Sequence, residues 1–302
     1  GRKVDAETDI TITSGGTEAL FAAIAAVVAP GDEVIVLDPC YDCYDPAITL
    51  QGARAVHVPL DPGDFSVDWV RVKEAVTPRT RMIVINSPHN PTGAVLSWAD
   101  LEALAALIRD MDILVVSDEV YEHITFDELE HQSVLRHPEL AARAFVVSSF
   151  GKTYHCTGWK VGYCVAPPAL SVEFRKVHQF LTFCTFHPAQ WALARVMEQE
   201  PGHHLGLGRF YEAKRDHFQA ALRASRFVLK PVKGAYFQLA DYSAISNLPD
   251  RAFCEWLVKE AGVAAIPVSA FYESSPDARL VRFCFAKHEA TMEAAAAKLL
   301  SL

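Results

Sequence analysis

Short apolar runs alternate with stretches of helical periodicity through the first two thirds of this 302-residue sequence. The strand-like runs cover residues 10–13, 33–37, 81–85, 113–116 and 144–147. Residues 17–28 and 101–108 carry apolar side chains at helical spacing instead. Runs that are apolar at nearly every position are typical of strands covered on both faces. The alternation therefore predicts an α/β fold, with a mostly parallel central sheet between layers of helices.

Beyond about residue 200 the pattern changes to shorter strands between longer helices. The helical stretches there are 205–224, 251–260 and 289–300. The strand-like runs are 227–230, 236–239 and 280–285. This pattern predicts a smaller C-terminal α+β domain, so we expect a large domain over 1–204 and a small domain over 205–302.

The charge balance argues against several classes of partner. The net charge is −9, and no cluster of Lys or Arg interrupts the acidic surplus. We therefore expect neither nucleic acid nor a membrane as a partner. No apolar run approaches the roughly 20 residues that span a bilayer. The seven cysteines are scattered, as is typical of reduced thiols in the cytoplasm.

Cys40 and Cys43 have the spacing of a redox or metal motif. A zinc site needs a second pair, and Cys156 and Cys164 lie too far apart to supply it. We therefore interpret the pair as ordinary thiols and expect no metal site.

A Gly-Gly turn precedes the first predicted helix. Gly16 and Thr17 follow the strand-like run 10–13 and begin the helix, where backbone N–H groups and the helix N-terminus attract an anion. The segment has neither a dinucleotide nor a P-loop fingerprint, and a plain tight turn explains it equally well.

Polar residues also follow the later strands. Asn90 belongs to an Asn-Pro-Thr-Gly loop, which is either a simple turn or a rigid mount for the amide. Asp118 and Tyr121 follow the strand 113–116 and are three residues apart, so a helical turn would place both on one side. They serve either as a cap or as partners for the nitrogen and hydroxyl of a pyridoxal ring.

Two lysines follow the last of these strands. Lys152 comes after Ser149 and a glycine, and Lys160 lies eight residues further on. A lysine at such a place is usually a solvated charge, but in the crevice at the strand ends it becomes an amine nucleophile. Lys160 has the reach to contact a phosphate. The Gly-Gly turn, an amide, a carboxylate, a phenol and two lysines thus follow successive strands. Together they favour one shared site at the strand ends.

The segments SGGTEAL, HNPTG, SDEVY, SSFGKTYHCTGWKVGY and LVRFCFAK resemble the class I/II aminotransferases of the aspartate-aminotransferase fold (fold type I). They are most similar to the branch that contains bacterial methionine aminotransferases and kynurenine aminotransferases. The resemblance covers nearly the whole chain, in family order. The 34-residue separation of Asp118 from Lys152 (152 − 118) is also that of the family.

The resemblance implies pyridoxal 5′-phosphate as the cofactor. It assigns the phosphate to Gly16, Thr17, Ser149 and Lys160. It assigns the pyridine ring to Tyr41, Asn90, Asp118 and Tyr121. It implies that Lys152 forms the Schiff base and then acts as the general base, while Asp118 keeps the ring nitrogen protonated. Asn90 and Arg282 would bind the substrate, with Arg282 on its α-carboxylate.

The resemblance also implies a ping-pong transamination between an amino acid and a 2-oxo acid, in a homodimer. The segment 176–183 offers His, Gln and aromatic residues but no second arginine, which favours methionine or aromatic donors over aspartate. The alternatives are a C–S β-lyase on the same cofactor and a non-catalytic sensor domain. Family members carry several dozen residues before the Gly-Gly turn, so we expect this chain to lack an N-terminal segment.

Overall fold

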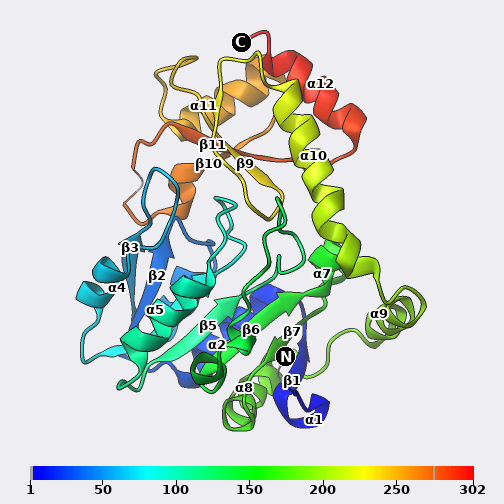
Figure 1. Cartoon of the computed structure of the whole chain (residues 1–302). Helices are drawn as coiled ribbons and strands as arrows, with labels where there is room; N and C mark the ends of the chain where they lie inside the picture. Colours follow the sequence, from blue (N-terminus) through cyan, green and yellow to red (C-terminus); the bar gives the residue numbers. More distant parts are fainter. Residues whose placement is uncertain (1–2, 275) are drawn as a thin grey trace.

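The computed structural model describes residues 3–274 and 276–302, and its larger half is built on a seven-stranded sheet (Figure 1). The strand order is β1 (Ile10–Thr13), β7 (Gly162–Val165), β6 (Ala144–Ser149), β5 (Leu114–Asp118), β4 (Thr80–Asn86), β2 (Glu33–Asp38) and β3 (Arg54–Pro59). The five strands from β6 to β3 pair in parallel, whereas β7 runs antiparallel to both β6 and β1. The predicted α/β class with a mostly parallel sheet is confirmed.

Helices cover both faces of this sheet because the strands are apolar at successive positions. Val84 and Val116 pack with one layer, and their neighbours Ile83 and Val115 pack with the other. The first layer contains α2 (Gly16–Val27), α3 (Tyr44–Thr49) and α8 (Pro168–Leu181). The second contains α4 (Trp69–Ala75), α5 (Trp98–Ile108) and α6 (Pro138–Ala141). The shorter helices α1 (Ala6–Asp9) and α7 (Phe150–Thr153) flank β1 and β6.

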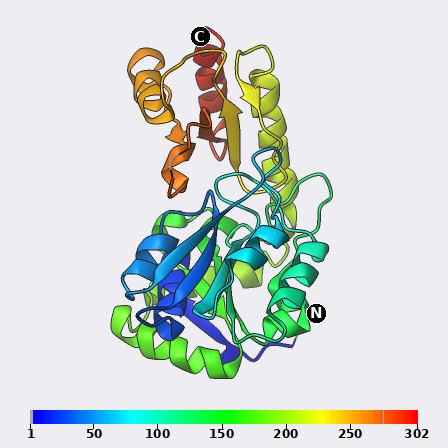
Figure 2. The ribbon, with the colours of Figure 1, turned by 90° about the vertical axis from the view of Figure 1, so that its left-hand side faces the viewer.

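A second, smaller sheet lies beyond the long helix α10 (Leu207–Ala221), which runs from the large half to the small one (Figures 1 and 2). Its antiparallel order is β10 (Ile266–Pro267), β11 (Leu280–Cys284), β9 (Phe237–Asp241) and β8 (Val228–Leu229). The helices α11 (Asp250–Trp256) and α12 (Glu289–Leu299) belong to the same half of the molecule. The division between residues 204 and 205 stays a prediction.

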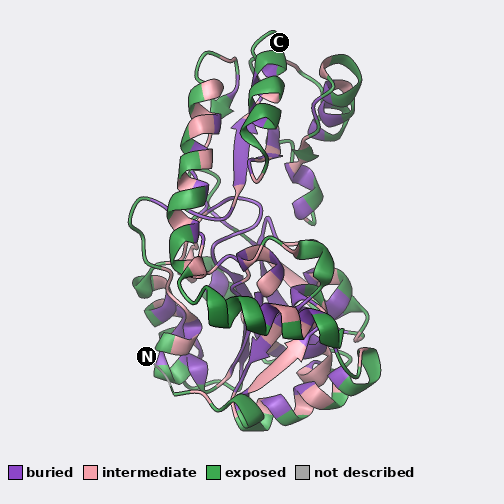
Figure 3. Cartoon of the chain, turned by 90° about the vertical axis from the view of Figure 1, so that its right-hand side faces the viewer, coloured by how far each residue is buried: buried purple, intermediate pink, exposed green. Residues whose placement is uncertain are grey.

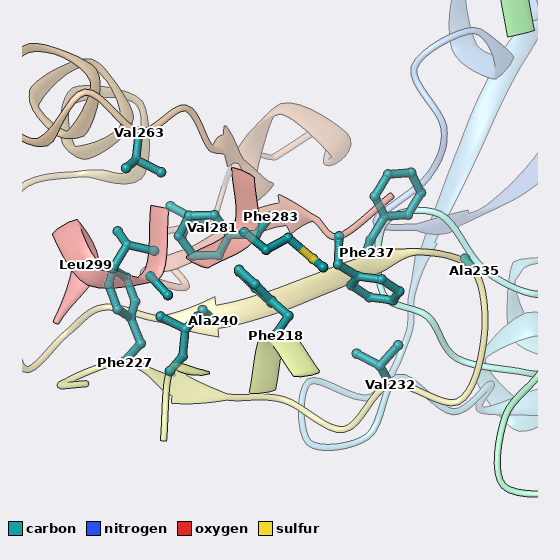
Figure 4. Packing of buried hydrophobic residues seen from close by; sticks show 14 of the residues in the cluster. Phe218, Phe227, Val232, Ala235, Phe237, Ala240, Val263, Val281, Phe283 and Leu299 are labelled. Atoms are coloured by element: carbon teal, nitrogen blue, oxygen red, sulfur yellow. The ribbon is translucent and has the colours of Figure 1, made fainter. Parts of the chain in front are cut away.

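The small half has an aromatic core of its own. Phe218 of α10, Phe283 of β11 and Phe227 converge there, with ring centroids 5.6–5.9 Å apart for the pairs that include Phe283. Leu299 of α12 closes the cluster (Figure 4). Tyr121 of the large half belongs to the same cluster, so the core of the small half extends to the residues that follow β5.

The structure adds elements that the periodicity did not predict. β3 is an edge strand whose side chains are mostly part-exposed, so Arg54 and His57 interrupt its apolar pattern. β7, α8 and α9 (His187–Gln199) were also missed. The predicted helix 251–260 is two elements, since α11 passes into the wider turn η4 (Leu257–Ala261).

Figure 3 shows buried residues along the strands and exposed residues on the outer helix faces. Within the described ranges, no helix combines the length and the apolar character that a membrane crossing requires.

A buried carboxylate at the start of β2 binds side chains from β3 and from the turn before β4. Glu33 is 1% exposed, and its Oε1 accepts hydrogen bonds from Arg54 at 2.8 Å and from Arg79 at 2.6 Å. The hydroxyl of Thr77 donates to Oε2 at 2.6 Å. These bonds lower the pKa of Glu33 from 4.5 to about 2.

We expect Glu33→Gln to lower the free energy of unfolding at pH 7 by about 1–2 kcal/mol, because two arginines lose their ionic partner. A carboxyl group whose folded pKa is depressed stabilises the protein above its unfolded value, and this contribution declines as the pH falls through the folded value. The deficit should thus be full above pH 4.5 and shrink toward pH 2. Urea unfolding across this range measures it, with the exposed Glu74→Gln as control. A deficit that does not depend on pH would refute the assignment.

Candidate active site

The loop before α2 packs so closely on β7 and Lys160 that only glycine fits. Gly15 has φ +84°, and a Cβ there would lie 3.3 Å from Cε of Lys160. Gly162 of β7 lies beneath the loop, where a Cβ would meet backbone atoms of Gly15 and Gly16 at 2.8 Å. The first turn of α2 therefore opens toward the cavity with its N–H groups beside a lysine, which is a suitable arrangement for an anion.

Asp118 is the last residue of β5 and is buried in the wall of a cavity. Its Oδ2 accepts a 2.7 Å hydrogen bond from the hydroxyl of Tyr44, and its Oδ1 accepts one from the backbone of Val120 at 3.3 Å. Asn86, its partner in β4, donates to the main-chain oxygen of Asp118 at 2.8 Å. The side-chain oxygen of Asn86 in turn holds the backbone N–H of Asn90 at 2.8 Å.

Burial dominates the protonation of Asp118. It raises the pKa of this carboxyl from 3.8 to about 6, and the bond from Tyr44 offsets only part of the increase. Asp118 is therefore a carboxylate at neutral pH whose charge lacks a cationic hydrogen-bond partner among the described residues. A ligand with a positively charged N–H group would stabilise it.

Lys152 follows β6 on the single turn α7, which lies at the foot of α10 (Figure 1). Its ammonium nitrogen lies 5.8 Å from the ring centroid of Tyr121 and 6.0 Å from that of Tyr236. No side-chain hydrogen bond or ion pair of this nitrogen exists among the described residues. Burial, with a smaller contribution from Lys160, lowers the pKa of Lys152. The amine is thus less protonated than a surface lysine.

These groups line one cavity of about 180 Å³. The predicted residues that line it are Gly16, Thr17, Tyr41, Asn90, Asp118, Tyr121, Ser149, Lys152 and Lys160. The lining also includes Gly15, the first residue of the predicted Gly-Gly turn, and the sequence analysis missed Leu20, Asn86, Val120 and Thr157. Asn86 carries the same signal as Asp118, a polar side chain directly after an apolar run. Tyr44 was also missed, three residues beyond Tyr41.

Arg282 reaches the site from the small sheet. It belongs to β11, and its Nη1 donates to the side-chain oxygen of Asn90 at 2.5 Å. The guanidinium lies over the rings of Phe237 and Phe271, with Cζ 4.1 Å and 4.9 Å from their centroids. Burial lowers the pKa of Arg282.

Two sequence-based expectations need correction. Asp118 and Tyr121 do line the same cavity, but they are joined by an irregular turn and not by a helix. The segment 176–183 does not line the cavity. His178 bonds to Glu18 on the outer side of α2, and Phe180 is 86% exposed. The absence of arginine from the segment 176–183 is therefore no evidence about the substrate.

We expect Asp118→Asn to stabilise the ligand-free protein at pH 7.5 by about 2–3 kcal/mol, because each pKa unit corresponds to about 1.4 kcal/mol. The folded pKa of this acid is raised, so its ionisation destabilises the fold at pH values above the two pKa values. The gain should develop between pH 3.8 and 6 and vanish below that range. Urea unfolding of the ligand-free proteins at pH 7.5 and below 4 tests this. An unchanged or lower stability at pH 7.5 would contradict it.

The chain is similar to known proteins along its length. The family model described as "Aminotransferase class I and II" matches residues 1–299. Methionine aminotransferase of Escherichia coli (strain K12) is 53% identical over 302 residues, which is 100% of this chain and 78% of that protein. Kynurenine–oxoglutarate transaminase 1 of Rattus norvegicus is 35% identical, over 97% of this chain and 77% of the relative.

Among solved structures, one from Escherichia coli, with a methionine aminotransferase function, superposes with a TM-score of 0.98 at 53% identity. The match covers 100% of this chain and 80% of that one. Family match, identity and superposition extend over the whole chain and agree with one another. The chain therefore belongs to the class I and II aminotransferases.

Proposed function

We propose that this aminotransferase uses pyridoxal 5′-phosphate to move the amino group of methionine or an aromatic amino acid to a 2-oxo acid, in a ping-pong cycle. The observation that carries the proposal is the shared cavity of Lys152 and Asp118. An amine of lowered pKa and a buried carboxylate are the two groups that this chemistry requires. The similarity to a methionine aminotransferase supports the choice of donor.

The residues present suit each part of the cofactor. The phosphate would be held by the N–H groups that begin α2, with Thr17, Ser149 and Lys160 around it. The absence of Cβ atoms at Gly15 and Gly16 lets this loop lie close to Lys160 and Val120. At the other end of the cavity, we assign Tyr41 to the face of the ring. Asn90 and Tyr121 would bind the ring hydroxyl, and Asp118 the ring nitrogen.

When bound, the cofactor supplies a conjugated ring that accepts the electron pair released at the substrate Cα. Asp118 holds a proton on the ring nitrogen, because a buried carboxylate stabilises an adjacent N–H cation. Lys152 would take the substrate Cα proton as general base and give it back at the carbon on the cofactor side of the amino nitrogen. Its lowered pKa increases the fraction of neutral amine at neutral pH.

Arg282 would bind the α-carboxylate of the substrate, since its planar fork matches a carboxylate. The aromatic rings of Phe237 and Phe271 hold the guanidinium flat beside Asn90. Arg282, Phe237 and Phe271 stand outside the lining of the cavity itself, so the choice of donor rests on the similarity to a methionine aminotransferase.

We include a cytoplasmic homodimer in the same proposal. Large apolar side chains are exposed at the end of α8 and on α9, where Phe183 is 77% and Trp191 60% exposed. Trp191 also lines an apolar groove with Ile12 and Val161. A monomer rarely leaves so much apolar surface in water, and a second copy would bury it. The seven cysteines, all free thiols, suit a reducing compartment.

Borohydride treatment tests the role of Lys152. We expect it to link the cofactor covalently to the wild-type chain but not to Lys152→Ala, whose turnover should fall at least about 100-fold because the general base is lost. Lys160→Ala is the matched control, since it should keep the covalent link and bind the cofactor less tightly. Peptide mapping locates the label. A label that remains in the Lys152→Ala chain would place the reacting amine elsewhere.

Donor screening tests the substrate. With a saturating 2-oxo acid, kcat/KM for methionine and phenylalanine should exceed that for aspartate and glutamate by about tenfold or more, because the described residues that line the cavity include no arginine to pair with a second carboxylate. A ranking in the opposite order would overturn the proposed specificity. Release of pyruvate from cystathionine without any 2-oxo acid would indicate the C–S β-lyase instead.

A further inference from the structure

Three potential metal ligands gather at the end of β2, on the side of the sheet edge that faces the small domain. Asp38 ends β2, Cys40 follows two residues later, and His57 belongs to the adjacent strand β3. The parallel register pairs Asp38 with Pro59 and so brings β3 alongside. One donor atom from each of the three side chains lies within 4.8 Å of the other two. Nδ1 of His57 is 2.8 Å from Oδ1 of Asp38.

The cluster is shielded from water and carries an acidic surplus. The side chains of His57 and Asp38 are 8% and 5% exposed, and Cys40 is 6% exposed. The charged side chains that most affect His57 are all acidic, namely Asp38, Asp45 and Glu273. The bond to Asp38 raises the pKa of His57, and burial raises that of the Cys40 thiol.

The geometry points to a site for a divalent cation, best matched by Zn²⁺, formed by Asp38, Cys40 and His57. A thiolate, an imidazole and a carboxylate are the donor set that zinc prefers. With bonds of about 2.3 Å to sulfur and 2.0–2.1 Å to nitrogen or oxygen, tetrahedral donors lie roughly 3.3–3.7 Å apart. The donor atoms of the cluster lie within 4.8 Å of one another, and Nδ1 of His57 is 2.8 Å from Oδ1 of Asp38, so the observed distances bracket this range. Binding releases the thiol proton and any imidazolium proton to solvent.

This site departs from the expectation of no metal, which rested on Cys40 and Cys43 as a pair. Cys43 is not part of the cluster. The partners of Cys40 come instead from β2 and from β3, a strand that the sequence analysis did not predict. Spacing along the chain therefore held no information about the donor set.

The position of the cluster would connect it to catalysis. Tyr41, which lines the cavity, is the next residue after Cys40. The backbone N–H of Cys40 donates to the main-chain oxygen of Phe271 at 2.7 Å, in the segment η5 (Val268–Phe271) that lies above the end of β2 (Figure 2). Phe271 in turn packs against Arg282. A bound cation would thus fix the segment that joins the two halves of the active site.

The test uses Zn²⁺ with the purified holoenzyme, without an affinity tag. Calorimetric titration should give one saturable site per chain, and X-ray absorption at the zinc edge should show one sulfur neighbour at about 2.3 Å. Cys40→Ser should remove the sulfur neighbour and weaken binding by about tenfold or more. Cys43→Ser is the matched control and should retain both. His57→Gln should weaken binding while keeping the sulfur neighbour, and it provides a second variant if Cys40→Ser does not fold.

Three results would overturn the site. They are the absence of saturable binding to the wild-type holoenzyme, a zinc environment without sulfur, and a sulfur neighbour that depends on Cys43 and not on Cys40. Because the titration measures zinc and not turnover, its failure would leave the proposed transamination untouched.

Discussion

The parallel pairing of β4, β5 and β6 is the constraint on which the site depends. Parallel strands end at the same edge of a sheet, so Asn86, Asp118 and Ser149 meet there although they are far apart in the sequence. The hydrogen bond from Asn86 to the main chain of Asp118 then orders the loop that carries Asn90. The apolar strands position these polar groups, and the two helix layers that cover the strands hold the edge rigid.

Burial of Asp118 is the electrostatic counterpart of this arrangement. An ionised carboxylate is unfavourable in an apolar wall, and the hydroxyl of Tyr44 is a neutral partner that compensates only in part. The folded chain therefore retains an unfavourable charge that a cationic ligand group would relieve. Such a conflict between stability and function is typical of active sites.

Much of the site could be predicted from the sequence because its residues directly follow apolar strands. Asp118 and Lys152 carry this local signal, and the family resemblance added the roles. Tyr44 and His57 carry no such signal, because their importance depends on which element lies beside them. β3 escaped prediction for a related reason, since an edge strand has one side open to water and a weaker apolar pattern. The segment 176–183 shows the reverse error, because its composition suited a binding role but the fold placed it on the outer surface.

The hydrogen bond between Asn90 and Arg282 joins the large sheet to the small one. The lysines of the cavity belong to the large half and Arg282 to the small half. The complete site therefore exists only while the two halves keep their present relative orientation. A rotation about the foot of α10 would separate Arg282 from Asn90 but leave the cavity lining, which belongs wholly to the large half, in place. The position of Arg282 therefore makes the spacing between the two halves a geometrical requirement of substrate capture. A substrate carboxylate bound by both Asn90 and Arg282 would hold the two halves in this orientation.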